Sequence, residues 1–250
     1  MILNPLYVLN GVGYLTEKKE EFESDYIKVR EKENRVLTDS EVSILPKTYS
    51  KNPNKKEWEL REKSTQRILN YLESKNKDLS ILDIGCGNGW FTNQLASISK
   101  ENKIIGLDVN TEELEQAVRL FETEKTCFLY GDVFKLEDFR AQFDIITLNA
   151  SVQYFSDFTK LITVLVNFLK INGEIHIIDS PFYEEKEIEK AKLRTELYYT
   201  NLGFPEMAKN YFHHKKGDLK DFVILYKPKG FIAQKLSKKS TPFLWLKYNK

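Results

Sequence analysis

Cysteine is scarce in this sequence, and long apolar runs are missing. Cys86 and Cys127 are the 2 cysteines among 250 residues, too few for a disulfide framework, so we expect a reducing, cytoplasmic location. No apolar run approaches the roughly 20 residues that cross a membrane. The N-terminus also lacks the basic region and the small-residue cleavage site of a signal peptide. We therefore predict neither a membrane span nor a signal peptide.

Excess charge of one sign is missing as well. The formal net charge is +1, which gives no electrostatic argument for a nucleic-acid partner. Hydrophobic residues make up 41% of the chain and charged residues 30%, as in ordinary globular proteins. The length suits one α/β domain of roughly 150 to 200 residues with an extension.

A glycine-rich stretch follows a short apolar run near residue 80. Residues 80–84 (SILDI) predict a buried parallel strand. Glycine then occupies every second position of 85–89 (GCGNG), and residues 90–96 take up helical spacing. This order places backbone N–H groups at the carboxyl end of a strand, where open α/β sheets bind ligands. The stretch therefore predicts a ligand site and not only a tight turn.

Strands and helices alternate after this stretch. Helical spacing begins at the capping residues Asn110 and Asp157, and the tail predicts a helix over 184–202 and closing strands at 222–226 and 242–248. Alternation of this kind predicts a parallel sheet with right-handed crossovers, that is, a doubly wound α/β fold. The four further strands of the alternating part are expected at 103–108, 126–130, 143–149 and 174–179.

Residues 1–78 precede this core, and we predict that they form an N-terminal helical extension that covers the site, with the core at 79–250. Residues 16–35 are dense in Glu and Lys, which is typical of a solvated helix. Residues 57–74 predict a helix that leads into the first core strand. Its Trp58 and Arg61 either reach the mouth of the site or serve as packing and ion-pair residues.

The glycine stretch has the pattern G-x-G-x-G, with Asp83 two residues before the first glycine. Dinucleotide-binding loops instead use G-x-G-x-x-G, so the spacing opposes an NAD-dependent oxidoreductase. The stretch closely resembles the first motif of class I S-adenosylmethionine (SAM) dependent methyltransferases. The resemblance covers 79–180 through motifs at four successive strand ends, and extends to residue 250 through topology.

This resemblance implies a Rossmann-like, doubly wound α/β fold. Its sheet has seven strands, mostly parallel, with a C-terminal antiparallel pair. It also implies SAM as the cofactor and S-adenosylhomocysteine (SAH) as the product.

The family pattern implies a role for several residues of this chain. Asp83 would help to fix the methionine end of SAM, and the Asp108 carboxylate would accept hydrogen bonds from both ribose hydroxyls. Asp132 would contact the adenine amine or, alternatively, only cap a helix; Asn149 would face the methionine end and the acceptor, or only form a turn. The complete set predicted to bind the cofactor is Asp83, Gly85, Cys86, Gly87, Asn88, Gly89, Asp108, Val109, Asp132, Val133 and Asn149.

The candidate catalytic residues are His213, His214 and Tyr154. The two histidines lie in the segment where this fold builds its acceptor pocket, or they form a solvated loop pair. Tyr154 lines the acceptor pocket or belongs to aromatic packing, and His176 reads as a structural residue inside a strand. Adjacent histidines point apart and no cysteine pair accompanies them, so we predict no metal site.

The acceptor is expected to be a small molecule, methylated on oxygen or nitrogen. The sequence has neither a stripe of basic and aromatic residues nor an N-P-P-[YF] motif after the fourth strand, where it reads NASV at 149–152. A methyltransferase for protein or RNA, and a non-catalytic SAM-binding partner subunit, remain alternatives. The pattern predicts neither the identity of the acceptor nor the oligomeric state.

Overall fold

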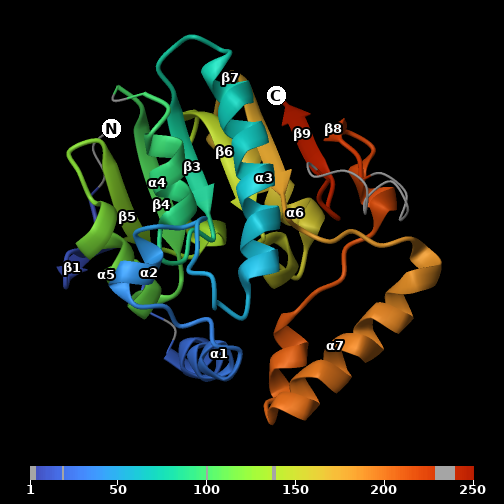
Figure 1. Cartoon of the computed structure of the whole chain (residues 1–250). Helices are drawn as coiled ribbons and strands as arrows, with labels where there is room; N and C mark the ends of the chain where they lie inside the picture. The colour runs from blue at the N-terminus through green and yellow to red at the C-terminus, as the bar shows by residue number, and fades with distance from the viewer. Residues whose placement is uncertain (1–3, 19, 100, 137–138, 229–239) are drawn as a thin grey trace.

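A single mixed sheet forms the centre of the protein, and helices cover both of its faces (Figure 1). The computed structural model describes residues 4–18, 20–99, 101–136, 139–228 and 240–250. Within these residues the sheet has nine strands in the order β1-β2-β5-β4-β3-β6-β7-β9-β8.

The seven predicted strands are all present. Five of them run parallel: β3 (Ser80–Ile84), β4 (Lys103–Asp108), β5 (Thr126–Tyr130), β6 (Phe143–Asn149) and β7 (Leu169–Ile178). The last strand, β9 (Trp245–Asn249), lies between β7 and β8 (Val223–Tyr226) and is antiparallel to both. The strand order reverses between β3 and β6, which leaves a crevice at the carboxyl end of β3, where the glycine stretch begins.

The N-terminal extension is not wholly helical, which corrects the prediction for residues 1–78. β1 (Tyr7–Leu9) and β2 (Val12–Tyr14) form a hairpin, and β2 pairs in parallel with β5. Asn10 and Gly11 connect the two strands with φ values of 49° and 84°. Positive φ at both turn residues matches the twist of a two-residue hairpin. The dipeptide Asn-Gly between apolar residues is typical of such hairpins and could have predicted this one from the sequence. The hairpin enlarges the predicted seven-stranded sheet to nine strands.

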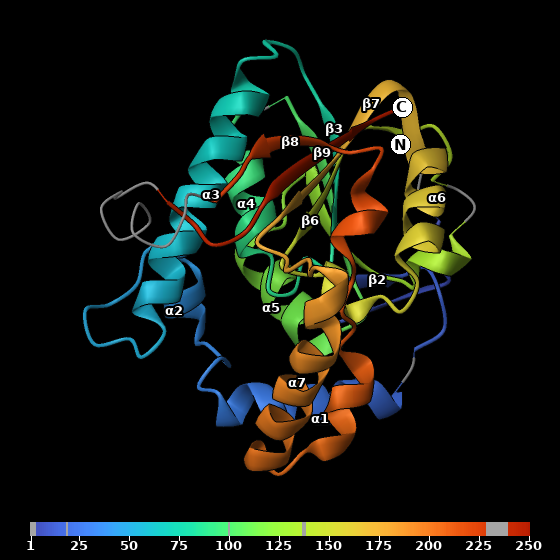
Figure 2. The same ribbon diagram turned by 90° about the vertical axis from the view of Figure 1, so that its right-hand side faces the viewer.

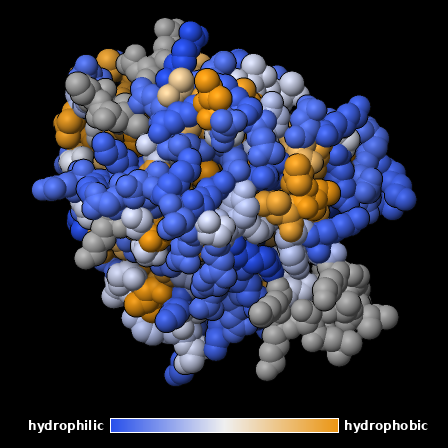
Figure 3. Space-filling model, turned by 90° about the horizontal axis from the view of Figure 1, so that it is seen from above, coloured by the Kyte–Doolittle hydropathy of each residue, from blue (hydrophilic) through white to orange (hydrophobic). Residues whose placement is uncertain are grey.

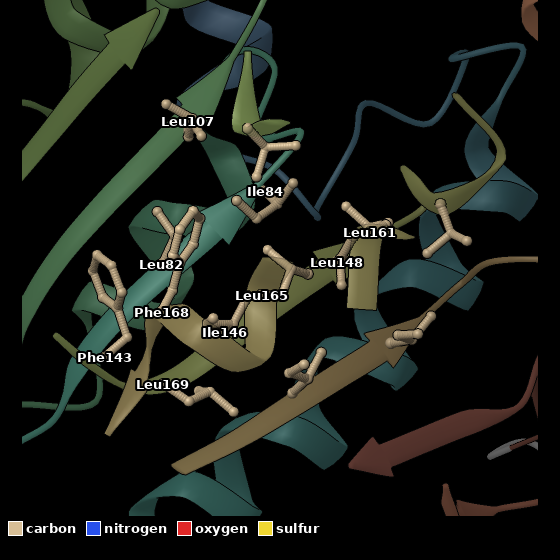
Figure 4. Packing of buried hydrophobic residues seen from close by; sticks show 14 of the residues in the cluster. Leu82, Ile84, Leu107, Phe143, Ile146, Leu148, Leu161, Leu165, Phe168 and Leu169 are labelled. Carbon is tan, nitrogen blue, oxygen red and sulfur yellow. The ribbon is translucent and has the colours of Figure 1, made fainter. Parts of the chain in front are cut away.

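Helices pack on the two faces of the sheet according to the alternation of its strands (Figure 2). One face carries α3 (Lys55–Glu73), α4 (Trp90–Ala96) and α5 (Thr111–Phe121), and the other carries α6 (Phe158–Phe168). Figure 4 shows the α6 side, where apolar side chains of the helix meet those of the central strands. Complete burial of such a side chain contributes about 1.5–3 kcal/mol. This packing fixes the strand ends on which the site is built. The labelled residues of this cluster are Leu82, Ile84, Leu107, Phe143, Ile146, Leu148, Leu161, Leu165, Phe168 and Leu169.

Two elements lie across the carboxyl end of the parallel strands. They are α1 (Glu20–Lys32) and α7 (Ile188–Leu202), the latter followed by the 3₁₀ helix η4 (Pro205–Asn210) (Figures 1 and 2). We call α1, α7 and η4 the cap. Buried Val29, Tyr199 and Met207 join these elements in a small apolar cluster of their own. The cap thus packs as a separate layer over the site, while the short helix α2 (Asp39–Val42) lies beside it.

The end of the molecule away from the cap is mostly hydrophilic (Figure 3). Apolar groups on this face are small and are separated by charged or polar side chains. Among the residues that the structure describes, no helix is both long and apolar enough to cross a membrane.

Candidate functional site

The glycine stretch forms a loop between β3 and α4 that leaves no room for side chains. Gly85, Gly87 and Gly89 have φ values of +72°, +52° and +76°, a region that only glycine adopts freely. A Cβ atom on Gly85 would lie 2.5 Å from the Ser151 Cβ atom. The backbone of the loop can therefore approach a ligand closely, as the sequence predicts.

Asp108 joins this loop to the end of β4. Its Oδ2 atom accepts a hydrogen bond from the Gly87 N–H at 2.8 Å, and Oδ1 accepts from the backbone N–H groups of Val109 at 2.7 Å and Asn110 at 2.9 Å. Burial raises the pKa of Asp108, and these N–H groups oppose the rise. A carboxylate oxygen accepts more than one hydrogen bond, so capacity remains for a bound ligand. Asp108 lies on the wall of a cavity, where it can accept such bonds.

The Asp83 side chain links β3, the strand before the loop, to α4 and β6. Its carboxylate accepts hydrogen bonds from the Thr92 hydroxyl at 2.7 Å and the Thr147 hydroxyl at 2.8 Å, and the residue is only 1% exposed. Burial raises its pKa from 3.8 to about 6. Asp83 is not among the residues that line the cavity, so its contribution runs through the positions of β3, β6 and α4.

Asp132 and Val133 form another part of the cavity wall, at the end of β5. The Asp132 carboxylate accepts a hydrogen bond from the Phe134 N–H at 3.2 Å and caps the 3₁₀ helix η1 (Val133–Lys135). Asp132 therefore both caps η1 and lines the cavity.

Two amide oxygen atoms, one at the end of β6 and one four residues after it, lack hydrogen-bond partners. The Oδ1 atom of Asn149 and the Oε1 atom of Gln153 are buried, with no hydrogen-bond partner among the described residues. Both side chains belong to the cavity wall. An unpaired buried polar atom costs about 1–3 kcal/mol, so these oxygens fit a ligand that offers N–H or O–H donors. The ammonium and hydroxyl groups of SAM are donors of this kind.

One cavity connects the glycine loop with the cap. Its volume is about 830 Å³, within the range of about 300–1,000 Å³ that is usual for small-molecule sites. Of the eleven residues predicted to bind the cofactor, nine line it, and Asp83 and Gly89 do not. The nine are Gly85, Cys86, Gly87, Asn88, Asp108, Val109, Asp132, Val133 and Asn149.

Tyrosines dominate the part of the cavity under the cap. Tyr26 meets Tyr154 edge-on with ring centroids 5.9 Å apart, and Tyr154 meets Tyr211 at 6.1 Å. Burial raises the pKa of these tyrosines, so their hydroxyls stay protonated at neutral pH. Tyr183, Tyr198 and Tyr199 line the same region. This half of the cavity suits an aromatic or acyl group that carries polar atoms.

A half-buried carboxyl group, Glu113, faces the glycine loop from the first turn of α5. A Cβ atom on Gly87 would lie 3.0 Å from the Glu113 Oε2 atom. Burial raises the pKa of Glu113 from 4.5 to about 7. In the sequence Glu113 stands three residues after the capping residue Asn110, which is consistent only with a helix start. Nothing in this local spacing indicated that the side chain faces a cavity.

The candidate catalytic histidines do not line the cavity. The His214 ring Nε2 atom lies 3.0 Å from the Val152 carbonyl oxygen, and the His213 Nε2 atom lies 2.9 Å from the Thr195 hydroxyl. Burial lowers the pKa of both imidazoles. Tyr154 does line the cavity. The catalytic role of all three stays a prediction, with the position of Tyr154 the most favourable.

The helix before the core brings Trp58 and Arg61 to the cavity wall. Arg61 donates to Glu57 at 2.9 Å and lies over the Trp58 ring, 5.3 Å from its centroid. Asp179, at the end of β7, is buried and accepts a hydrogen bond from the Ser64 hydroxyl at 2.5 Å. No group of three or more potential metal ligands occurs within the described part of the chain.

Comparison with known proteins assigns this architecture. A family model described as "Methyltransferase domain" matches residues 75–237. Two malonyl-[acyl-carrier protein] O-methyltransferases are similar to the chain. That of Halalkalibacterium halodurans is 28% identical over 46% of this chain and 45% of its own length. That of Bacillus anthracis is 23% identical over 72% of this chain and 68% of its own length. The chain thus matches less than half of the first relative and about two thirds of the second.

Solved structures confirm the predicted fold. The magnesium protoporphyrin IX methyltransferase of Synechocystis, solved with bound SAH, superposes with a TM-score of 0.54 at 14% identity and covers 92% of this chain and 95% of its own. The architecture is that of the Rossmann-like SAM-dependent methyltransferases, and the predicted cofactor, SAM, is confirmed at the level of the family.

Proposed function

This chain belongs to the methyltransferase domain family, and we propose that it transfers the methyl group of SAM to an oxygen atom of a small-molecule acceptor. The observation that carries the proposal is one cavity shared by two parts of the molecule. The glycine loop and Asp108 line one part of it, and the tyrosines of the cap line the other. Donor and acceptor thus have a shared space between the sheet and the cap.

The residues around the glycine loop would hold the cofactor. Asp108 has carboxylate capacity left for the ribose hydroxyls, and Asp132 and Val133 form the wall at the position proposed for adenine. Asn149 offers its unpaired Oδ1 atom to a donor at the methionine end. Bound here, SAM supplies a methyl group on a sulfonium, which is already an activated leaving group.

The protein's own contribution is to position the acceptor and to exclude water. Methyl transfer from a sulfonium neutralises charge, so placing the acceptor in line matters more than stabilising a new charge. The cap supplies the enclosure through Tyr26, Tyr199 and Met207. A neutral hydroxyl acceptor would also need a base. Of the predicted candidates only Tyr154 lines the cavity, and its raised pKa keeps its hydroxyl protonated at neutral pH, so Tyr154 would position such an acceptor and a base would have to be another group.

An oxygen atom of a small acceptor is favoured by two observations. The two relatives described above are named as O-methyltransferases. The cavity lies beneath the cap and has a small-molecule volume, which suits a diffusible or tethered small group better than a folded protein or RNA. A cytoplasmic location, expected from the two cysteines, is part of this proposal.

Calorimetric titration with SAM, SAH and NAD tests the cofactor half of the proposal. We expect SAM and SAH to bind and NAD not to bind. Methyl transfer from isotopically labelled SAM to a panel of carboxylic acids, phenols and amines, followed by mass spectrometry, tests the acceptor half. Cofactor binding with no transfer to any oxygen acceptor would favour the partner-subunit alternative. Loss of SAH binding would remove the proposal altogether.

A further inference from the structure

We propose that Arg30 of α1 binds a carboxylate group of the acceptor, which makes the substrate class a small aromatic or acyl compound bearing a carboxylate. The inference rests on the proposed function, because it assigns the ligand of the same cavity. Arg30 lies in a helix that the sequence predicts to be solvated, yet it lines the cavity beneath the cap.

The guanidinium of Arg30 has unused donors. Its Nε atom is buried, with no hydrogen-bond partner among the described residues. Its nearest ion-pair contact joins Nη1 to the Glu33 Oε2 atom at 3.7 Å, too far for a hydrogen bond. The guanidinium lies over the Tyr26 ring, whose centroid is 5.2 Å from the guanidinium carbon. A planar donor fork of this kind matches a carboxylate in bidentate geometry.

The neighbouring carboxylates leave these donors free. Glu33 pairs with the Arg35 Nε atom at 3.2 Å and accepts a hydrogen bond from the Tyr198 hydroxyl, so its charge is shared. Glu113 also faces Arg30, but burial brings its pKa to about 7, so it is partly protonated at neutral pH. Neither group supplies Arg30 with a hydrogen bond among the described residues.

Tyrosine hydroxyls surround the same space. Tyr154, Tyr199 and Tyr211 line the cavity, and their hydroxyls have no hydrogen-bond partner within the described residues. Together with Arg30 they offer donors that a carboxylate accepts, while their rings pack against an apolar body. Donors and aromatic rings on the wall of one cavity therefore point to an aromatic or acyl carboxylate.

Calorimetry on the SAH-bound protein tests this assignment with defined probes. Benzoate and hexanoate are each compared with the amide of similar shape, benzamide and hexanamide. We expect both carboxylates to bind at least about 10-fold more tightly than their amides. In Arg30→Gln the affinities for the carboxylates should fall about 10-fold, and those for the amides should stay unchanged. Arg30→Lys should fall between the two.

Arg119→Gln is the matched control, because Arg119 is an exposed guanidinium that pairs with Asp39 outside the cavity. This variant should keep the wild-type preference for carboxylates. No difference between carboxylates and amides in the wild type, including no binding of either, overturns the inference, as does a preference that survives in Arg30→Gln. A loss of SAH affinity in Arg30→Gln, with carboxylate affinities retained, would assign Arg30 to the carboxylate of the cofactor and overturn it too. Failure of the wild type to bind SAH would instead count against the proposed function.

Discussion

Asp108 has two functions at one carboxylate, since it fixes the Gly87 N–H and lines the cavity. Asp108→Ala should weaken SAH binding by about 10- to 100-fold, because hydrogen bonds to a charged group contribute about 1.5–3 kcal/mol. Calorimetry measures the affinity, and a thermal unfolding curve confirms that the variant is folded. Glu112→Ala removes an exposed carboxylate from the next helical turn and is the matched control. Equal affinities of Asp108→Ala and the wild type would remove Asp108 from the cofactor site.

Asp83 makes the stability of the protein depend on pH. Its pKa is about 6 in the folded state against 3.8 for the unperturbed group, because the carboxylate is buried. The folded state therefore binds this proton more tightly than the unfolded chain does. The resulting stabilisation is complete below pH 4, is lost as the pH rises to about 6, and then stays constant.

The test of this dependence is urea unfolding of Asp83→Asn between pH 4 and pH 8. The free energy of unfolding should fall less steeply in the variant than in the wild type between pH 4 and pH 6, by on the order of 2 kcal/mol. The exposed Asp78→Asn serves as control and should follow the wild type. If the free energy of unfolding depends on pH in the same way in Asp83→Asn and in the wild type, the pKa of Asp83 is the same in the folded and unfolded states, which contradicts the prediction.

At the scale of elements, the turn between β3 and α4 depends on glycine for two reasons. Gly89 has φ +76°, and a Cβ atom there would lie 2.7 Å from the Phe128 ring and 2.8 Å from the Ala117 Cβ atom. Gly89→Ala should therefore lower the free energy of unfolding by about 2 kcal/mol or more. Gly217→Ala is the control, because a Cβ atom there meets nothing within 4 Å. Chemical denaturation of both variants measures the difference, and equal losses would contradict the steric argument.

The elements of the core could be predicted because their signals are local. Apolar runs located β3 and β4 to the residue, and the capping residues Asn110 and Asp157 located the starts of α5 and α6. The start of β7 was less accurate. The pattern placed it at residue 174, but Leu169 is buried and pairs with Phe143, so the strand begins there.

The cap side of the site could not be predicted in the same way. Arg30 and Tyr26 lie in a segment whose mixed charges are typical of a solvated helix, and only the tertiary position of α1 turns them toward the cavity. Glu113 is a second example, because the residues around it predict the start of a helix but not that its side chain faces the glycine loop. Cavity residues at the strand ends were therefore predicted from sequence, as was the alternative that Trp58 and Arg61 reach the cavity, whereas Tyr26, Arg30 and Glu113 were not.

At the scale of the whole molecule, the cap and the core are stabilised unequally. Three buried side chains, Val29, Tyr199 and Met207, form the apolar cluster of the cap, whereas the core clusters extend across both faces of the sheet. A region with few buried apolar contacts opens at a lower free energy than the global one. The amides of α1 and α7 should thus exchange with deuterium at least about 10-fold faster than those of β3 and β6. Bound SAH should slow the exchange of α1 if the cap closes over the cofactor.

Two alanine substitutions in buried apolar clusters test whether the cap opens independently or unfolds together with the core. Met207→Ala and Leu165→Ala each remove a buried side chain, with an expected cost of about 2–5 kcal/mol where the group is fully packed. Met207→Ala should speed exchange in α1 and α7 while the denaturation midpoint of the whole protein stays near that of the wild type. Leu165→Ala, on the core-facing side of α6, should lower that midpoint and speed exchange in β3 and β6. If Met207→Ala lowers the midpoint as much as Leu165→Ala does, the cap and the core unfold as one unit, and access to the cavity cannot rest on independent opening of the cap.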